Sequence, residues 1–207
     1  VVGIDVALAQ KVADRLGVSL KVDDMAFSEL ITTLQAGNCD IVIAGLPETE
    51  ERAQAVDFSK VYLNDQQCII VRSGDAAEYT SLDDFAGKKV AAEMGSSSES
   101  VARSELTGAD IVSLSLVSDV FLELENGSVD AVVTGAVVGK QYTISNPDLV
   151  QLDLTFAEPD KPASAAVRKG DTELLDVVNS VIDEVSSDGT MDAWVDEYSQ
   201  KASENAQ

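Results

Sequence analysis

Hydrophobic and polar positions along this chain change period several times between its two ends. Around Leu8 and Val12, apolar residues recur three and four positions apart, which is typical of a helix with one buried face. Residues 41–44 are apolar in succession, which is typical of a buried strand. Gly17 and Gly37 follow helical stretches, where helices commonly end. The pattern therefore predicts short helices and strands in alternation.

The expected elements alternate along the whole chain. Helices are expected at residues 5–16 (with Asp5 as N-cap), 28–36, 81–84, 95–106, 118–124, 137–142, 172–187 and 190–202. Strands are expected at residues 20–22, 41–44, 67–72, 89–93, 111–114, 131–134, 149–154 and 163–168. Strands and helices at this spacing predict a doubly wound α/β architecture, in which helices cover the faces of a sheet.

The alternation pauses twice, near residues 62–67 and near the turn-rich residues 157–162. Two pauses predict two α/β lobes, the second inserted in the first. Lobe 1 would consist of residues 1–65 plus 160–207, and lobe 2 of residues 66–159. Such an arrangement places a cleft between the lobes, where a ligand can trigger hinge closure.

The charge balance excludes several classes of partner. The chain has 207 residues, with 37 acidic against 14 basic side chains and a formal net charge of -23. Nucleic acids are bound through clustered lysine and arginine, so a nucleic-acid partner is excluded. An anionic membrane surface is excluded for the same reason. No apolar run approaches the roughly 20 residues of a spanning helix. The chain opens VVGIDVALAQ, without the basic and apolar regions of a signal peptide, so we expect a mature or trimmed soluble piece.

Histidine is absent from the sequence, which removes the commonest general base and every Ser-His-Asp or Cys-His nucleophile. We therefore expect no enzyme, no cofactor and no metal. Cys39 and Cys68 lack the spacing of a zinc site, and they either pair in an exported protein or serve as small buried hydrophobes. Trp194 stands at helical spacing and is expected to pack in the core.

The stretch 44–62, AGLPETEERAQAVDFSKVY, carries the candidate binding chemistry. It follows the apolar residues 41–43 and contains Arg52. Open α/β sheets bind ligands at the carboxyl ends of their strands, and a guanidinium group offers a planar fork for a carboxylate. The alternative is a solvated helix charge, because Glu51 and other acids are its neighbours and surface ion pairs are common.

Five segments occur in an order that resembles a known family. They are GIDVALAQKVADRLGVSLK, FSELITTLQAGNCDIVIAGLPETEERAQAVDFSKVY, SLDDFAGKKVAAEMGSSSES, DAVVTGAVVGKQY and VRKGDTELLDVVNSVIDEVSSDGTMDAWVDEY. The family is that of the bacterial extracellular solute-binding proteins, family 3, of polar amino-acid ABC transporters. The resemblance implies a two-lobed type II periplasmic-binding fold, each lobe a mostly parallel sheet flanked by helices. It also implies capture of a polar amino acid or related small carboxylate and delivery to an ABC permease, by a periplasmic protein or a cell-surface lipoprotein.

The resemblance also assigns roles to individual residues of this chain. Phe27 would stack on the solute, although a core phenylalanine is an equal alternative. Ala44 and Gly45 would form a turn whose backbone groups meet the ligand. Arg52 would clamp its carboxylate, and Ser97 would donate to the same carboxylate from the second lobe.

The serine cluster that contains Ser97 also fits an anion site on physical grounds. Ser96 and Ser97 open an expected helix, and free N–H groups at a helix start attract anions. Serines in such a place also commonly cap the helix.

Two residues depart from the family pattern. Pro47 replaces a threonine or serine, so a hydroxyl and an N–H donor to the ligand are missing. Gly135 replaces the acidic residue that binds the ligand's ammonium group, so an α-amino ligand would need another acid. Glu93 is one candidate, with a solvated strand-end acid as the alternative reading. A carboxylate ligand without an amino group becomes a rival.

The family pattern begins one strand before residue 3. We therefore expect an exposed sheet edge and a swapped or edge-paired homodimer. Two other functions remain open at this stage. One is the sensor domain of a membrane signalling protein, against which the polar tail 201–207 argues as a chain end. The other is an enzyme similar to cyclohexadienyl dehydratase.

Overall fold

The computed structural model describes the backbone of residues 3–204, with side chains except at 196 and 199–204. The chain forms two compact units. Unit 1 contains the chain up to Asn64 and the segment Pro162–Tyr198, and unit 2 contains Asp65–Lys161. The expected polar tail 201–207 lies outside the described side chains.

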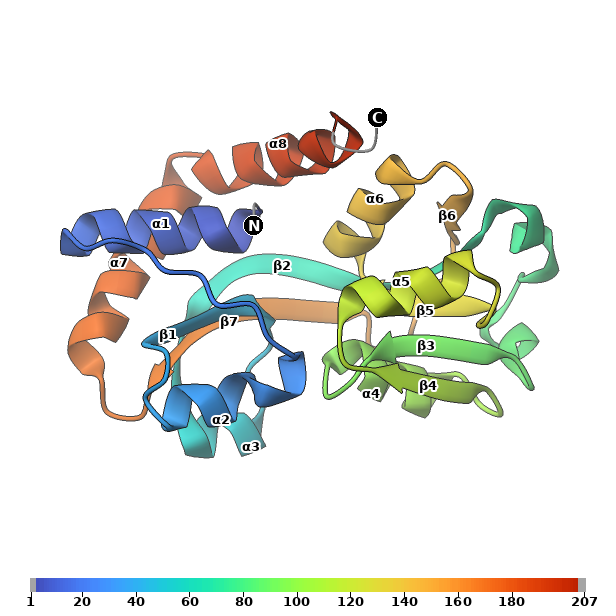
Figure 1. The fold of residues 1–207 in the computed structure, drawn as a ribbon, viewed down its shortest axis with the longest axis horizontal. Coiled ribbons are helices and arrows are strands. Elements are labelled where there is room, and N and C mark those ends of the chain that lie inside the picture. Colours follow the sequence, from blue (N-terminus) through green and yellow to red (C-terminus); the bar gives the residue numbers. More distant parts are fainter. Residues whose placement is uncertain (1–2, 205–207) are drawn as a thin grey trace. The chain divides into compact units, whose positions relative to one another are not determined.

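Unit 1 contains the helices of both ends of the chain (Figure 1). In chain order its elements are α1 (Ile4–Leu16), η1 (Phe27–Glu29), α2 (Leu30–Gln35), β1 (Ile41–Leu46), α3 (Glu50–Ala55), the first part of β2 (Val56–Arg72), most of β7 (Asp160–Arg168), α7 (Thr172–Ser187) and the first part of α8 (Thr190–Glu204). Helices α1 and α7 pack against each other.

Unit 2 begins within β2 and ends within β7. Between them lie η2 (Ser73–Glu78), η3 (Leu82–Phe85), β3 (Lys89–Glu93), α4 (Ser97–Glu105), β4 (Asp110–Leu114), α5 (Val117–Glu125), β5 (Ala131–Gly135), α6 (Ala136–Ser145) and β6 (Leu149–Gln151). The capped turn expected at residues 81–84 is η3, where Ser81 and Asp84 form a capping box.

The sheet is mixed in its strand directions. The strand order is β1-β7-β2 in unit 1 and β2-β5-β3-β4 in unit 2, with β6 also paired to β2. Strand β1 is antiparallel to β7, and β5 and β6 are antiparallel to β2. Strand β3 is parallel to both β4 and β5. In the β2–β5 ladder, Gln67 lies opposite Gly135, which brings two candidate regions together.

Alternate side chains of β2 enter two different cores of unit 2. Ile69 and Val71 pack with the α4 side of the sheet, and Cys68 and Ile70 pack with the α5 side. All four are buried because helices cover both faces of the sheet. Residues 68–71 are therefore all apolar, although their side chains still point alternately to the two faces of the sheet.

The expected pause at residues 62–67 contains no helix and includes the boundary between the two units, and β2 continues through it with Tyr62 and Gln67 buried. Two other expectations about the fold are wrong. Residues 20–22 form no strand, because they pair with no other strand and Val22 is exposed. Asp5 is not an N-cap, since α1 begins at Ile4 after Gly3.

The two cysteines are free thiols in the structure. Cys68 is buried in unit 2, and burial raises the pKa of its thiol to about 12. Cys39 is half-buried in unit 1. Of the two readings left open by the sequence, the small buried hydrophobe therefore describes Cys68. Within the described part of the chain, no helix combines the length and the apolarity needed to cross a bilayer.

Candidate functional site

The loop after β1 fixes the position of Arg52 in unit 1. Thr49 is the N-cap of α3, and its hydroxyl accepts a hydrogen bond from the backbone N–H of Arg52 at 3.2 Å. The Arg52 Nη1 donates to the carbonyl oxygen of Pro47 at 2.9 Å. The guanidinium carbon lies 5.5 Å from the centre of the Phe27 ring, within the range of a cation–π contact. The structure thus brings Phe27, Pro47 and Arg52 together.

The charged guanidinium group of Arg52 is partly buried. Burial lowers the pKa of Arg52, and the charge of Glu51 acts in the opposite direction. An arginine stays protonated at neutral pH even so. Pro47 supplies no hydroxyl or N–H, as expected from the sequence, but its carbonyl holds the guanidinium group.

The glycine turn at the end of β1 is held by a buried tyrosine. Gly45 has a φ of 56°, in the left-handed region that favours glycine, and the ladder with β7 is irregular between Val42 and Leu46. The N–H of Gly45 donates to the Tyr62 hydroxyl at 3.0 Å. That hydroxyl donates to Asp5 Oδ1 at 2.7 Å. Burial and the nearby Asp5 raise the pKa of Tyr62 well above its usual value.

This network bears on the expected ligand turn. Ala44 and Gly45 lie in β1, and the Gly45 N–H is engaged by Tyr62 within unit 1. The network fixes the backbone conformation of the turn, because the Tyr62 hydroxyl is both donor and acceptor. A ligand contact at these two residues stays a prediction.

The neighbouring serines of unit 2 have different hydrogen-bonding roles. The Ser96 hydroxyl caps α4: it accepts from the backbone N–H of Glu99 at 3.2 Å and donates to the Glu93 carbonyl at 2.7 Å. Its hydroxyl thus serves the helix start, and contact of Ser96 with a ligand stays a prediction. Glu93 ends β3 opposite Leu114 and is half-buried.

Ser97 has a different partner. The buried Gln67 side chain donates from Nε2 to the Ser97 Oγ at 2.9 Å. The neighbouring Ser98 donates its hydroxyl hydrogen to Gln67 Oε1 at 2.8 Å. Since Ser97 accepts from Gln67, its own hydroxyl hydrogen is not used by this bond and can be donated elsewhere. Ser97 thus has the chemistry of an anion ligand at the start of α4.

Gly135 is placed at the end of β5, where a charged pair surrounds it. A Cβ atom built on Gly135 would lie 2.5 Å from Asp65 Oδ2 and 3.0 Å from Lys161 Nζ. The expectation that no carboxylate remains at this point is wrong, because Asp65 of β2 reaches it.

The expected residues therefore form one set in each unit. Unit 1 holds Phe27, Ala44, Gly45, Pro47 and Arg52, and unit 2 holds Glu93, Ser96, Ser97 and Gly135. Sequence reasoning missed the polar partners of these sets, which are Asp5, Tyr62, Asp65 and Gln67. The available signal is the alternation of Asp65 and Gln67 before the apolar run of β2, but their partners depend on strand register.

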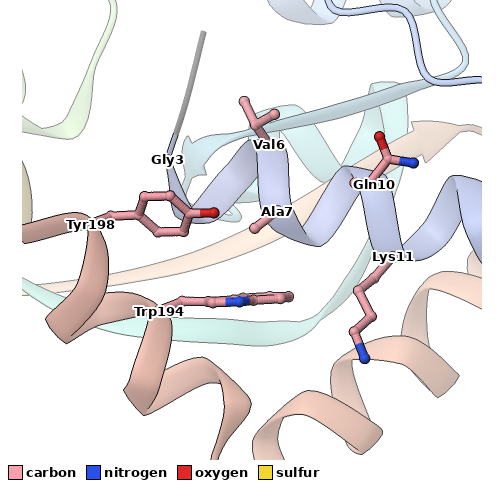
Figure 2. Close-up of a pocket in the computed structure, with 7 residues that line it drawn as sticks. All are labelled: Gly3, Val6, Ala7, Gln10, Lys11, Trp194 and Tyr198. Carbon is pink, nitrogen blue, oxygen red and sulfur yellow. The ribbon is translucent and has the colours of Figure 1, made fainter. Parts of the chain in front are cut away.

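A pocket of about 380 Å³ lies elsewhere in unit 1, between α1 and α8 (Figure 2). The Trp194 ring lies flat beneath Ala7, and Tyr198 lies beside Gly3. Its lining also includes Val6, Gln10 and Lys11. None of the expected ligand residues lines it.

Comparison with known proteins gives consistent similarities. Residues 1–201 match the bacterial extracellular solute-binding proteins, family 3. The chain is 32% identical over 195 residues to the arginine-binding extracellular protein ArtP of Bacillus subtilis, covering 93% of this chain and 75% of that protein.

Solved structures agree with the sequence comparison. The amino acid ABC transporter substrate-binding protein AbpA from Streptococcus pneumoniae, bound to L-arginine, is similar with a TM-score of 0.91 and 35% identity, over 98% of this chain and 85% of that one. An ancestral arginine-binding protein bound to glutamine has a TM-score of 0.86 and 38% identity, over 95% and 87% of the two chains. These neighbours have the type II periplasmic-binding fold, which confirms the expected fold class.

Proposed function

Because the chain belongs to the bacterial extracellular solute-binding proteins, family 3, we propose that it captures a polar amino acid and delivers it to an ABC permease. L-Arginine is the first candidate ligand. The two units would act as the lobes that close on the ligand, with Arg52 clamping the α-carboxylate.

The observation that carries this proposal is that the Arg52 guanidinium group is already held in one position. The Pro47 carbonyl and the Phe27 ring hold its guanidinium group in a partly buried place. A guanidinium fixed in this way loses little side-chain entropy when a carboxylate binds. The planar fork of a guanidinium group also matches the geometry of the two oxygens of a carboxylate.

Unit 2 supports the proposal with a second donor. Ser97 begins α4, and its hydroxyl hydrogen is left available by the bond that it accepts from Gln67. The structure thus adds to the sequence pattern a hydroxyl that accepts from Gln67 and keeps its own hydrogen out of that bond. An anion at this place would also meet the positive end of the helix dipole.

Arginine is preferred among polar amino acids for two reasons. ArtP and AbpA are described as arginine-binding and arginine-bound. In addition, the formal net charge of -23 produces a field that attracts a cationic solute and favours its approach. Glutamine is the competitor, since an ancestral arginine-binding protein is described as bound to it.

The setting of this function is also a proposal. The protein would work outside the cytoplasm, as its family description implies, either free or held at the cell surface as a lipoprotein. Among the described strands, β1 is the end strand of unit 1. Pairing of two chains along an end strand stays part of the proposal and is checked by light scattering.

Isothermal titration calorimetry with L-arginine and L-glutamine tests the function. We expect arginine to bind more tightly than glutamine, and Arg52→Ala to weaken arginine binding about 10-fold or more, because a charge-assisted hydrogen bond contributes about 1.5–3 kcal/mol. Arg15→Ala is the matched control, since it removes an exposed arginine of α1 that pairs with Glu184. Absence of amino-acid binding by the unaltered protein would refute the proposal.

A further inference from the structure

We propose that Asp65 supplies the carboxylate that binds the α-ammonium group of the ligand, in the space that Gly135 leaves open. This inference rests on the proposed function, because it names the group that recognises the amino end of an amino acid. It assigns a binding role to a residue of β2 that neither its sequence neighbours nor its spacing indicates.

The pairing of β2 with β5 brings Asp65 to this space. Gln67 lies opposite Gly135, and Asp65 stands two residues earlier on the same strand. Residues two apart along a strand point to the same face, so Asp65 and Gln67 share a face. The Asp65 Oδ2 lies 2.5 Å from the point that a Cβ of residue 135 would occupy. The carboxylate thus stands where a side chain of residue 135 would begin.

The glycine at 135 leaves room for the Asp65 carboxylate, and its backbone conformation does not require a glycine. Gly135 has a φ of -68° and a ψ of 144°, which any residue adopts. A Cβ at 2.5 Å from Oδ2 and 3.0 Å from Lys161 Nζ would require the ends of these two side chains to shift. Glycine at 135 and aspartate at 65 therefore belong together: the absence of a side chain on β5 makes room for a carboxylate from the neighbouring strand β2.

Backbone N–H donors hold the Asp65 carboxylate in place. The backbone N–H of Gln66 donates to Oδ1 at 2.8 Å, and the N–H of Val137 lies 3.2 Å and 3.3 Å from the two oxygens. Lys161 acts on the carboxylate through its charge. The pKa of Asp65 is raised from its ordinary value, because burial outweighs the N–H donors and the charge of Lys161, which lower it. An ionised, half-buried carboxylate is the usual partner of an ammonium ion.

A purely structural role for Asp65 is the competing explanation. Gly135 has no side chain with which to cap α6, and Asp65 accepts from Val137 in the first turn of that helix. The substitution Asp65→Asn separates the two roles. Asparagine keeps an oxygen that accepts from the helix N–H groups, but it loses the charge that binds an ammonium ion.

Calorimetry with two ligands tests the inference. The ligands are L-arginine and 5-guanidinopentanoate, which is arginine without its α-amino group. We expect Asp65→Asn to weaken arginine binding about 10-fold or more and to leave 5-guanidinopentanoate binding unchanged, because only arginine loses a charged partner. Asp153→Asn, which makes the same change at an exposed site of unit 2, is expected to alter neither affinity.

Three outcomes overturn the inference. They are an unchanged arginine affinity in Asp65→Asn, an equal loss for both ligands, or a variant that no longer melts cooperatively without ligand. If the unaltered protein binds arginine in any of these cases, the proposed function survives and only the role of Asp65 falls. If the unaltered protein binds no amino acid, the proposed function itself fails.

A carboxylate exchange between the two strands provides a second test. Gly135→Asp alone places two carboxylates in one space and is expected to lower the melting temperature. The double substitution Asp65→Gly with Gly135→Asp moves the acid to β5, and we expect it to bind arginine at least 10-fold more tightly than Asp65→Gly alone. Failure of the exchange to improve on Asp65→Gly contradicts the inference.

Discussion

Gln67 uses the Ser97 hydroxyl oxygen as an acceptor and leaves the hydroxyl hydrogen of Ser97 out of their bond. The Gln67 Nε2 donates to the Ser97 Oγ at 2.9 Å, while its Oε1 accepts from Ser98 at 2.8 Å. Both polar atoms of this buried amide are therefore used, and the amide cannot accept a hydrogen from Ser97 at the same nitrogen. A buried glutamine thus determines the chemistry of a half-buried serine at the start of α4.

Replacement of Gln67 by glutamate is expected to reverse this arrangement. A glutamate carboxylate accepts from both serine hydroxyls, so Ser97 would turn its hydrogen inward and no longer offer it to a ligand. The added charge would also repel a carboxylate. We expect Gln67→Glu to weaken arginine binding about 10-fold or more, measured by calorimetry.

The adjacent residue offers a matched control for this prediction. Gln66 is exposed, and Gln66→Glu makes the same chemical change one position away. We expect Gln66→Glu to bind arginine as the unaltered protein does. Equal affinities for Gln67→Glu and Gln66→Glu would show that the Ser97 hydroxyl plays no part in binding.

Tyr62→Phe is expected to destabilise unit 1. The substitution leaves the Gly45 N–H and the Asp5 carboxylate without the hydroxyl that joins them in a buried place. Loss of a buried hydrogen-bond partner costs about 1–3 kcal/mol of unfolding free energy, which urea denaturation measures. Tyr142→Phe serves as the control, because Tyr142 stacks on Phe121 with ring centres 3.6 Å apart. Equal stabilities of the two variants would contradict the role given to the Tyr62 hydroxyl.

Asp57 is expected to contribute to stability in a defined pH range. Its hydrogen bonds from Lys169 and the Gly170 N–H lower its pKa from the ordinary value of 3.8. A lowered folded-state pKa gives stability above pH 3.8 that is lost as the pH falls through the folded value. The difference in urea stability between the unaltered protein and Asp57→Asn should therefore be constant near neutral pH and shrink in acid. A difference that grows below pH 3.8 would contradict this assignment.

Much of the fold could be predicted from local pattern. The bounds of α7, Thr172–Ser187, follow directly from its amphipathic period and its preceding Asp171 cap. The continuation of β2 across residues 62–67 could not be predicted in this way. These residues are polar and irregular in sequence, and they stay extended because Tyr62 and Gln67 find buried partners far along the chain.

Only those parts of the candidate site that depend on residues nearby in the sequence could be predicted. Arg52 follows a strand end and a helix cap, both visible locally. Asp65 and Gln67 reach the site because the β2–β5 ladder places Gln67 opposite Gly135. Strand register of this kind cannot be read from a short stretch of sequence. The same holds for the Tyr62 hydroxyl, whose partners lie 17 and 57 residues away.

The two-sided burial of β2 limits how this protein can change during evolution. Insertion or deletion of one residue near Gln67 would exchange the cores that Cys68 and Ile69 enter. A register shift of one residue moves every side chain of a strand to the opposite face of the sheet. The same slip would turn Asp65 or Gln67 away from Gly135. New ligand preferences in this strand must therefore arise by exchange of residues at fixed length, and chain-length variation among relatives should fall outside it.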